Sequence, residues 1–449
     1  MNLQLLDRLK NKHFLSLAGN GVMSVLGMLN MMILYRALSV ANIGMWVFFL
    51  SILLLVDTFR SGFLTTAFIK FYAGAGEERS KEVLGSAWYL GIIITGILLL
   101  LNLPAYLVLF YIKNPSLAFF IEWFGIIYVA SLPSFIAACV VQAEQRFDQL
   151  LYIRFCNQGS FILIVFLLVV TGTASLQNII YAYLTSAIAT SLLTMVMGWS
   201  RLSSIKYRSK ACVKELFNFG KFTVLTTLSS NLFGTSNTII VNFMLGPAAL
   251  AVFNLGSRLM EIIEIPLRSF AATGMPELSA AFNAGDKKKV IDTLKKYIGT
   301  ITLTMLPICI SGAVLADIAI GILGGSKYVN SEAANIMRIL MIFALLYPLD
   351  RFFALTLDVI HQPQINFIKV LVMLVGSIGA SFAGVYITGN IYGIAVGGIV
   401  PILIGIGISK WALNRYYRFR FIDIYKEGYS QIKQLIATNW LVLFPKKYS

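Results

Sequence analysis

The stretch that decides the fold covers residues 248–282 and reads AALAVFNLGSRLMEIIEIPLRSFAATGMPELSAAF. We expect one long apolar helix that carries four charged residues, Arg258, Glu261, Glu264 and Arg268. Spacings of three, three and four residues place all four on one helical face. Charges at membrane depth are costly, so they usually face a polar interior and mark a transport or ion pathway. The stretch therefore predicts a water-accessible cavity inside a membrane protein.

The remainder of the chain has the composition of a membrane protein. Of its 449 residues, 58% are hydrophobic and only 12% are charged, whereas soluble proteins carry about 25% charged residues. A membrane-spanning helix needs roughly 20 apolar residues. The pattern predicts an all-α polytopic membrane protein with about twelve transmembrane helices. The expected spans are 14–36, 43–71, 84–111, 117–142, 150–171, 177–199, 217–244, 248–283, 297–324, 333–359, 364–387 and 391–414.

The net charge of +16 could indicate a nucleic-acid partner, but its distribution indicates membrane topology. With the N-terminus inside, about 28 of the 36 Lys and Arg residues fall on the cytoplasmic side, as the positive-inside rule requires. We therefore expect both termini in the cytoplasm, anionic lipid as a contact and no nucleic-acid partner. The short basic segment 1–13 precedes an apolar stretch without a clear cleavage site, so no cleavable signal peptide is expected.

The two halves of the sequence resemble each other at a gap-free offset of 207 residues, which pairs Leu38 with Leu245 and Val83 with Val290. Six spans in each half give both halves the same orientation, so the repeat is parallel, with a pseudo-two-fold axis along the membrane normal. The predicted lobes are 1–205 and 206–415, followed by a basic cytoplasmic or interfacial tail at 416–449. In transporters with such repeats the substrate site lies between the halves.

The same offset relates charged residues in the two halves. Asp57 aligns with Glu264, and each acid is followed one helical turn later by an arginine, Arg60 or Arg268. The tenth predicted span adds Asp350 and Arg351.

Two interpretations of these charges remain open. The acids and arginines can be ion pairs that hold helices together, especially Asp57–Arg60 and Glu264–Arg268. Alternatively, the arginines form an anion site, because a guanidinium binds phosphate or carboxylate with two parallel bonds; the candidates are Arg60, Arg258, Arg268 and Arg351. The acids would orient them or couple transport to a proton or sodium gradient, since burial raises the pKa of a carboxyl group; the candidates are Asp57, Glu261, Glu264 and Asp350.

Catalytic and cofactor motifs are not found in the sequence. It contains two histidines and four cysteines, with neither a metal-ligand spacing nor a pair that predicts a disulfide. A phosphate-binding P-loop is also missing, so direct use of ATP is not indicated. We expect no cofactor, no metal and no enzymatic activity.

The first third of the chain carries a family resemblance. It rests on ILYRALS at 33–39, IG at 43–44, GFLTTA at 62–67 and FYAG at 71–74. This run resembles the first helix, turn and second helix of the multidrug/oligosaccharidyl-lipid/polysaccharide exporter superfamily, in its polysaccharide-exporter branch. That branch contains the flippases of O-antigen, lipopolysaccharide and capsule repeat units.

The resemblance implies a V-shaped pair of helical bundles in the bacterial cytoplasmic membrane, working by alternating access. The implied substrate is a polyprenyl-pyrophosphate-linked oligosaccharide, moved from the inner to the outer leaflet and held by arginines in a central cavity. One alternative is a cation-coupled multidrug exporter of the same superfamily, although that branch usually has acidic cavities. Another is a membrane glycan polymerase or ligase, which usually carries a large outer loop that this sequence lacks.

Overall fold

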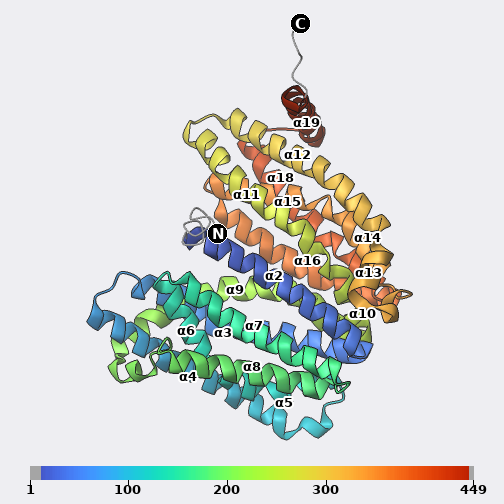
Figure 1. Cartoon of the computed structure of the whole chain (residues 1–449). Coiled ribbons are helices and arrows are strands. Elements are labelled where there is room, and N and C mark those ends of the chain that lie inside the picture. The colour runs from blue at the N-terminus through green and yellow to red at the C-terminus, as the bar shows by residue number, and fades with distance from the viewer. Residues whose placement is uncertain (1–11, 444–449) are drawn as a thin grey trace. The chain divides into compact units, whose positions relative to one another are not determined.

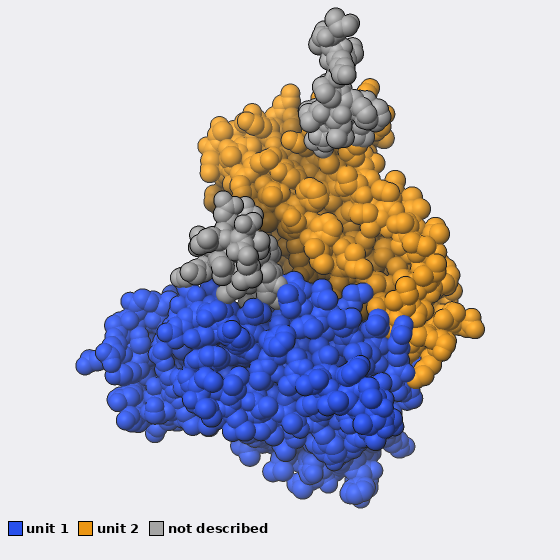
Figure 2. Space-filling view, viewed as in Figure 1, with its two compact units in different colours: residues 1–251 blue, residues 252–449 orange. Residues whose placement is uncertain are grey.

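The computed structural model describes residues 12–443, and among these it contains helices and turns but no β-strand (Figure 1). Segments 1–11 and 444–449, at the ends of the predicted N-terminal lobe and tail, lie outside the described residues. The chain divides into two compact units, an N-terminal unit of residues 1–251 and a C-terminal unit of residues 252–449 (Figure 2). The lobe boundary between 205 and 206 stays a prediction.

The helices of the N-terminal unit are α2 (Lys12–Ala37), α3 (Val40–Tyr72), α4 (Glu77–Leu107), η1 (Leu109–Tyr111), α5 (Pro115–Ala130), α6 (Leu132–Ala143), α7 (Phe147–Val170), α8 (Leu176–Val196), η2 (Leu202–Tyr207) and α9 (Lys210–Met244). Helix α10 (Pro247–Arg258) continues from this unit into the next. The C-terminal unit continues with α11 (Met260–Asn283), α12 (Lys287–Val314), α13 (Ala316–Gly324), η3 (Ser326–Tyr328), α14 (Ala333–Ala344), α15 (Tyr347–Val359), α16 (Pro363–Thr388), α17 (Tyr392–Gly397), α18 (Ile399–Tyr416) and α19 (Phe421–Leu443).

The all-α polytopic membrane fold is confirmed. Over the described residues, seven helices are long and apolar enough to cross a membrane, and two bent pairs, α5–α6 and α14–α15, raise this to nine. The three other predicted spans fall on α2, α9 and the pair α10–α11. Polar and charged residues lower the hydropathy of α9 and α11, which is why composition alone does not single them out.

The expectation of one continuous helix over 248–282 is wrong at one point. The helix breaks at Leu259, between α10 and α11. There the N–H of Ile262 donates to the carbonyl of Leu259 at 3.2 Å, a tighter bond than the α-helical pattern. Pro266, one turn further on, cannot donate to the carbonyl of Ile262, which weakens the helical ladder next to the break.

Helix α9 packs along α3 through positions without side chains. A Cβ at Gly220 would lie 2.6 Å from the carbonyl oxygen of Phe63, and a Cβ at Gly62 would lie 2.8 Å from the Cα of Val224. Further along, Asn231 donates to Thr58 Oγ1 at 2.6 Å. Small residues allow close backbone approach, and side-chain amides form bonds between helices in a membrane. Helix α9 is therefore an integral part of the N-terminal unit.

The two units contain the same turn at corresponding places. The turn from α6 to α7 places Gln145 at φ 57°, and the turn from α15 to α16 places His361 at φ 59°. In both, the N–H of the next residue donates to the carbonyl five residues earlier, at 2.8 Å and 2.9 Å, a Schellman-type helix end. Both turns follow a span that is bent in its middle, by 48° in α5–α6 and 43° in α14–α15. The local structure therefore agrees with an internal repeat.

The repeat is not free of gaps, contrary to the sequence alignment. Val40 and Pro247, the first residues of α3 and α10, lie 207 residues apart, but the left-handed glycines after these spans, Gly74 and Gly285, lie 211 apart. The second copy is thus longer by about one helical turn, which preserves the face of each side chain. Asp57 is consequently related to the α11 charge stripe as a whole and to no single acid in it.

Candidate functional site

Arg60 of α3 lies in the interior of the N-terminal unit with its guanidinium fully engaged. Its side chain is 5% exposed and pairs with Asp57 at 2.7 Å. Its Nη1 donates to the main-chain oxygen of Tyr128 at 3.1 Å, and its Nη2 donates to Ser131 Oγ at 3.1 Å. The guanidinium carbon also lies 4.2 Å from the Tyr128 ring centre and 4.7 Å from that of Phe135. A buried arginine requires such partners, because desolvating a charge is costly.

These contacts place Arg60 at the break between α5 and α6. Ser131 separates the two helices, and Pro133 is the second residue of α6. Proline has no N–H, so the backbone ladder is interrupted here. Arg60 and the hydroxyl of Ser131 both bond to the Tyr128 carbonyl at this place. The ion pair with Asp57 therefore serves a structural purpose as well as fixing the charge in position.

A cavity of about 450 Å³ opens beside Arg60 within the N-terminal unit. Its polar wall combines guanidinium, amide and hydroxyl groups, and its other wall is apolar or aromatic. It is lined by Met23, Arg60, Ser131, Ser134, Phe135, Ile153, Arg154, Asn157, Gln158, Tyr183 and Thr190. This lining contains two arginines and neither aspartate nor glutamate. Ligand pockets typically measure 300–1,000 Å³, so the cavity is large enough for part of a polar anionic ligand.

Arg154 was missed by the sequence analysis, which assigned it to the cytoplasmic end of its span. It lies in α7, with Asn157 and Gln158 three and four residues later. All three line the cavity, and Gln158 donates to the main-chain oxygen of Met23 in α2 at 3.3 Å. A polar i, i+3, i+4 pattern at the start of an apolar helix is the signal that could have identified it.

The charged stripe of the C-terminal unit is paired along its own helix. Arg258 lies 3.2 Å from Glu261 across the break at Leu259, and Arg268 pairs with Glu264. Both pairs are solvent-accessible in the structure, with the Arg268 side chain 71% exposed. Charges this exposed on a membrane helix need a polar surrounding, because lipid cannot solvate them.

The tenth predicted span separates its two charges. Asp350 in α15 lies 3.1 Å from the Nζ of Lys369 in α16, which is buried at 2% exposure. Arg351 is exposed, and it makes no hydrogen bond or ion pair with the part of the chain that the structure describes. Lys369 was not among the predicted intramembrane charges, because it lies near the start of its predicted span. The structure thus brings Asp350 to Lys369 and leaves Arg351 open to a ligand.

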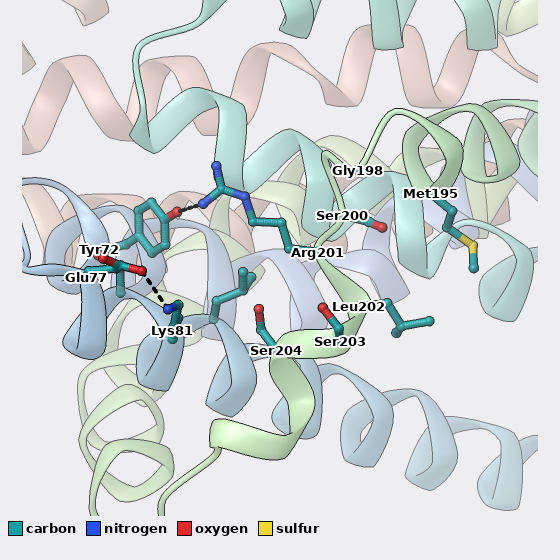
Figure 3. A pocket seen from close by; sticks show the side chains of 12 residues that line it. Tyr72, Glu77, Lys81, Met195, Gly198, Ser200, Arg201, Leu202, Ser203 and Ser204 are labelled. Carbon is teal, nitrogen blue, oxygen red and sulfur yellow. Dashed lines mark hydrogen bonds and ion pairs between the residues drawn. The ribbon is translucent and has the colours of Figure 1, made fainter.

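A second cavity of about 570 Å³ lies in the N-terminal unit where α4 begins and α8 ends (Figure 3). In Figure 3, Arg201 and Tyr72 point toward each other, and Glu77 contacts Lys81. Both cations of this cavity are held by acids: Arg201 by Glu144 at 2.7 Å and Lys81 by Glu77 at 2.6 Å. An anion would have to compete with these carboxylates, so the cavity beside Arg60 is the better candidate site.

A chain with these helices and an enclosed polar cavity has the architecture of a multi-span membrane transporter. The chain belongs to the polysaccharide biosynthesis protein family, which matches it over residues 33–333, and through it to the multidrug/oligosaccharidyl-lipid/polysaccharide exporter superfamily. The predicted superfamily and branch are therefore confirmed.

One curated relative is the probable low-salt glycan biosynthesis flippase Agl15 of Haloferax volcanii. It is 22% identical over 302 residues, which cover 66% of this chain and 60% of that protein. The alignment thus spans about 60% of the relative's length.

Solved structures show the same fold at low sequence identity. An inward-facing multidrug resistance MATE family transporter gives a TM-score of 0.71 at 14% identity, covering 88% of this chain and 95% of the other. The lipid II flippase MurJ, in an inward closed conformation, gives 0.70 at 16% identity, covering 97% and 93%. A transporter of the same superfamily from Pyrococcus furiosus gives 0.55 at 16% identity, covering 92% and 96%.

Proposed function

We propose that this protein is a flippase that moves a polyprenyl-pyrophosphate-linked oligosaccharide repeat unit from the inner to the outer leaflet of the bacterial cytoplasmic membrane. It would act by alternating access in cell-surface polysaccharide biosynthesis, with both termini in the cytoplasm. Family membership and the resemblance to glycan and lipid II flippases support this class of substrate.

The observation that carries the proposal is the cavity beside Arg60. Its lining holds two guanidinium groups and no carboxylate, which favours a phosphate or an acidic sugar over a cationic drug. Its amides and hydroxyls, on Asn157, Gln158, Ser134 and Thr190, are the neutral partners that sugar hydroxyls require. The apolar wall and the surrounding lipid would accommodate the polyprenyl chain.

The charged residues take different parts in this proposal. Arg351 offers a guanidinium that no described residue occupies, so it is the arginine most available to bind pyrophosphate or an acidic sugar. Arg258 and Arg268 are proposed to bind the same groups while Glu261 and Glu264 orient them. Arg60 is proposed to present positive charge to the cavity while Asp57 holds it in place.

Energy coupling is proposed to use a proton or a sodium ion at one of four acids. Asp57 and Glu261 are the first choices, and Glu264 and Asp350 complete the set. Each of these carboxylates pairs with a basic side chain in the structure, so a change in its protonation would alter the charge around an arginine or lysine. No cofactor is required.

The proposal is tested with purified protein in proteoliposomes that contain a fluorescent polyprenyl-pyrophosphate-linked oligosaccharide. A membrane-impermeant glycosidase reports the fraction of glycan on the outer surface. We expect this fraction to rise over that in protein-free vesicles, with Arg154→Ala abolishing the rise. A flat signal together with uptake of a cationic dye by the same vesicles would replace the flippase by the multidrug exporter. New glycosidic bonds in the recovered lipid would instead indicate a polymerase or ligase.

A further inference from the structure

The C-terminal helix α19 is attached to the C-terminal unit by backbone contact. A Cβ at Gly299 of α12 would lie 2.2 Å from the main-chain oxygen of Ile424, and one at Gly428 would lie 2.3 Å from Gly299. Ile424 is fully buried in this contact. Two glycines facing each other allow helix axes to approach closely. One face of α19 is therefore fixed against α12, beside which it lies in Figure 1.

The segment before α19 is fixed as well. The Nζ of Lys410, near the end of α18, donates to the main-chain oxygen of Phe419 at 2.5 Å and lies 2.9 Å from the centre of its ring. The main-chain N–H of Arg420 donates to Asp423 in the first turn of α19. These contacts hold α19 directly at the end of the last predicted membrane span, where lipid headgroups meet water.

The opposite face of α19 is exposed and has a distinct composition. At 100° per residue, five positions fall within about 100° of the helix circumference: Ile422, Tyr425, Lys426, Tyr429 and Lys433. All five are exposed, Tyr429 at 66%. This stripe holds two lysines, two tyrosines and one aliphatic residue but no acid. Tyrosine and lysine with an aliphatic neighbour are typical of helices that lie in a membrane interface, because the rings sit at headgroup level and the lysines extend to phosphate.

The surroundings of the stripe are also basic. Lys287, Lys288 and Lys289 are exposed in the first turn of α12, the helix on which α19 is docked, and Arg415, Arg418 and Arg420 are exposed between α18 and α19. Trp411, half exposed at the end of α18, lies 3.9 Å from the guanidinium of Arg415. An aromatic residue beside a cation at the end of a span is expected at a headgroup layer.

We propose that the exposed stripe of α19 binds anionic phospholipid of the cytoplasmic leaflet, with Lys426 and Lys433 contacting headgroup phosphates and Tyr425 and Tyr429 lying at the interface. The proposal rests on the cytoplasmic placement of the C-terminus and is independent of the transported substrate. Positive charge near an anionic bilayer is worth about 1 kcal/mol per lysine. Removing each lysine should therefore weaken binding about fivefold.

The test follows amide hydrogen exchange of residues 421–434 in the full-length protein in nanodiscs of phosphatidylcholine alone or with 30% phosphatidylglycerol. We expect exchange to slow several-fold with phosphatidylglycerol and to recover in high salt. Lys426→Gln/Lys433→Gln should abolish the difference, whereas Lys288→Gln/Lys289→Gln, which removes the same charge from α12, should retain it. Unchanged exchange in phosphatidylcholine would show that the α19 variant is still docked on α12.

Three outcomes would overturn the proposal. Exchange that is equal in both lipids would mean that anionic headgroups are not bound. An equal loss in both double variants would mean that only total charge matters. Fast exchange in both lipids, slowed by an added acidic protein, would assign the stripe to a protein partner instead.

Discussion

The guanidinium of Arg60 donates to the main-chain carbonyl of Tyr128 at the point where the fourth predicted span is broken. A charge that sequence analysis marks as a possible ligand thus also completes the backbone hydrogen bonding of a bent helix. The same group borders the cavity that we assign to the substrate. Structure and function therefore depend on one side chain, which makes its substitution informative only beside variants that separate the two.

Arg60→Ala should destabilise the protein as well as impair transport. The substitution leaves the Asp57 carboxylate and the Tyr128 carbonyl without their partner, and removing one member of a buried pair costs about 3 kcal/mol. We expect the midpoint of thermal unfolding in detergent to fall by several degrees, with Arg60→Lys recovering only part of it. The control is Arg268→Ala, which breaks an exposed pair and should shift the midpoint little.

Arg154→Ala should abolish glycan translocation and leave the unfolding midpoint unchanged, since its side chain is exposed at the cavity wall. Arg154→Lys should retain part of the activity because it keeps the charge but loses bidentate binding. Lys113→Ala removes an exposed cation outside this cavity and should behave as wild type. Normal transport by Arg154→Ala would remove this residue from the proposed site.

Arg258→Ala should impair export with little loss of expression. Its ion pair with Glu261 is exposed, and such pairs contribute at most about 1 kcal/mol to stability. Quantifying membrane-inserted protein beside surface glycan in cells separates the two effects. If Glu261 serves only to orient Arg258, Glu261→Gln should reduce transport less than Arg258→Ala; a larger loss would favour Glu261 as the coupling acid.

Gly220→Ala should weaken the attachment of α9 to α3. The added methyl group would lie 2.6 Å from the carbonyl oxygen of Phe63, which the backbone can relieve only by moving apart. Gly234→Ala, on the same helix, meets nothing within 4 Å and should be neutral or stabilising by about 1 kcal/mol, because alanine favours helix. Thermal unfolding of the two variants provides the comparison, and equal midpoints would contradict the close packing of α3 and α9.

The Asp350–Lys369 pair should respond to single and double substitution in different ways. Asp350→Asn leaves the buried Lys369 without its counter-charge, so we expect reduced folded yield and a lower unfolding midpoint. Asp350→Asn/Lys369→Met removes both charges and should recover most of that loss. A double variant as unstable as the single one would show that the pair is not the main role of Asp350.

Much of the architecture can be predicted from the sequence because lipid imposes a strong requirement. Apolar runs such as 84–111 and 364–387 have to be helices that satisfy their own backbone groups, and they are α4 and α16 in the structure. The positions of the charges on a helix face follow from its period, which is why the pairs Arg258–Glu261 and Glu264–Arg268 are visible in the sequence. The superfamily was likewise readable from residues in the first third of the chain.

What only the tertiary structure decided is which neighbours each charge and each bend acquires. Lys369 reaches Asp350 from another helix, and Arg154 meets Arg60 at one cavity although 94 residues separate them. The break at Leu259 and the extra turn in α10–α11 were invisible, because a continuous and a broken helix share the same hydrophobic pattern. Sequence period fixes the direction of a side chain on its own helix, whereas its partner depends on how helices distant in the chain pack together.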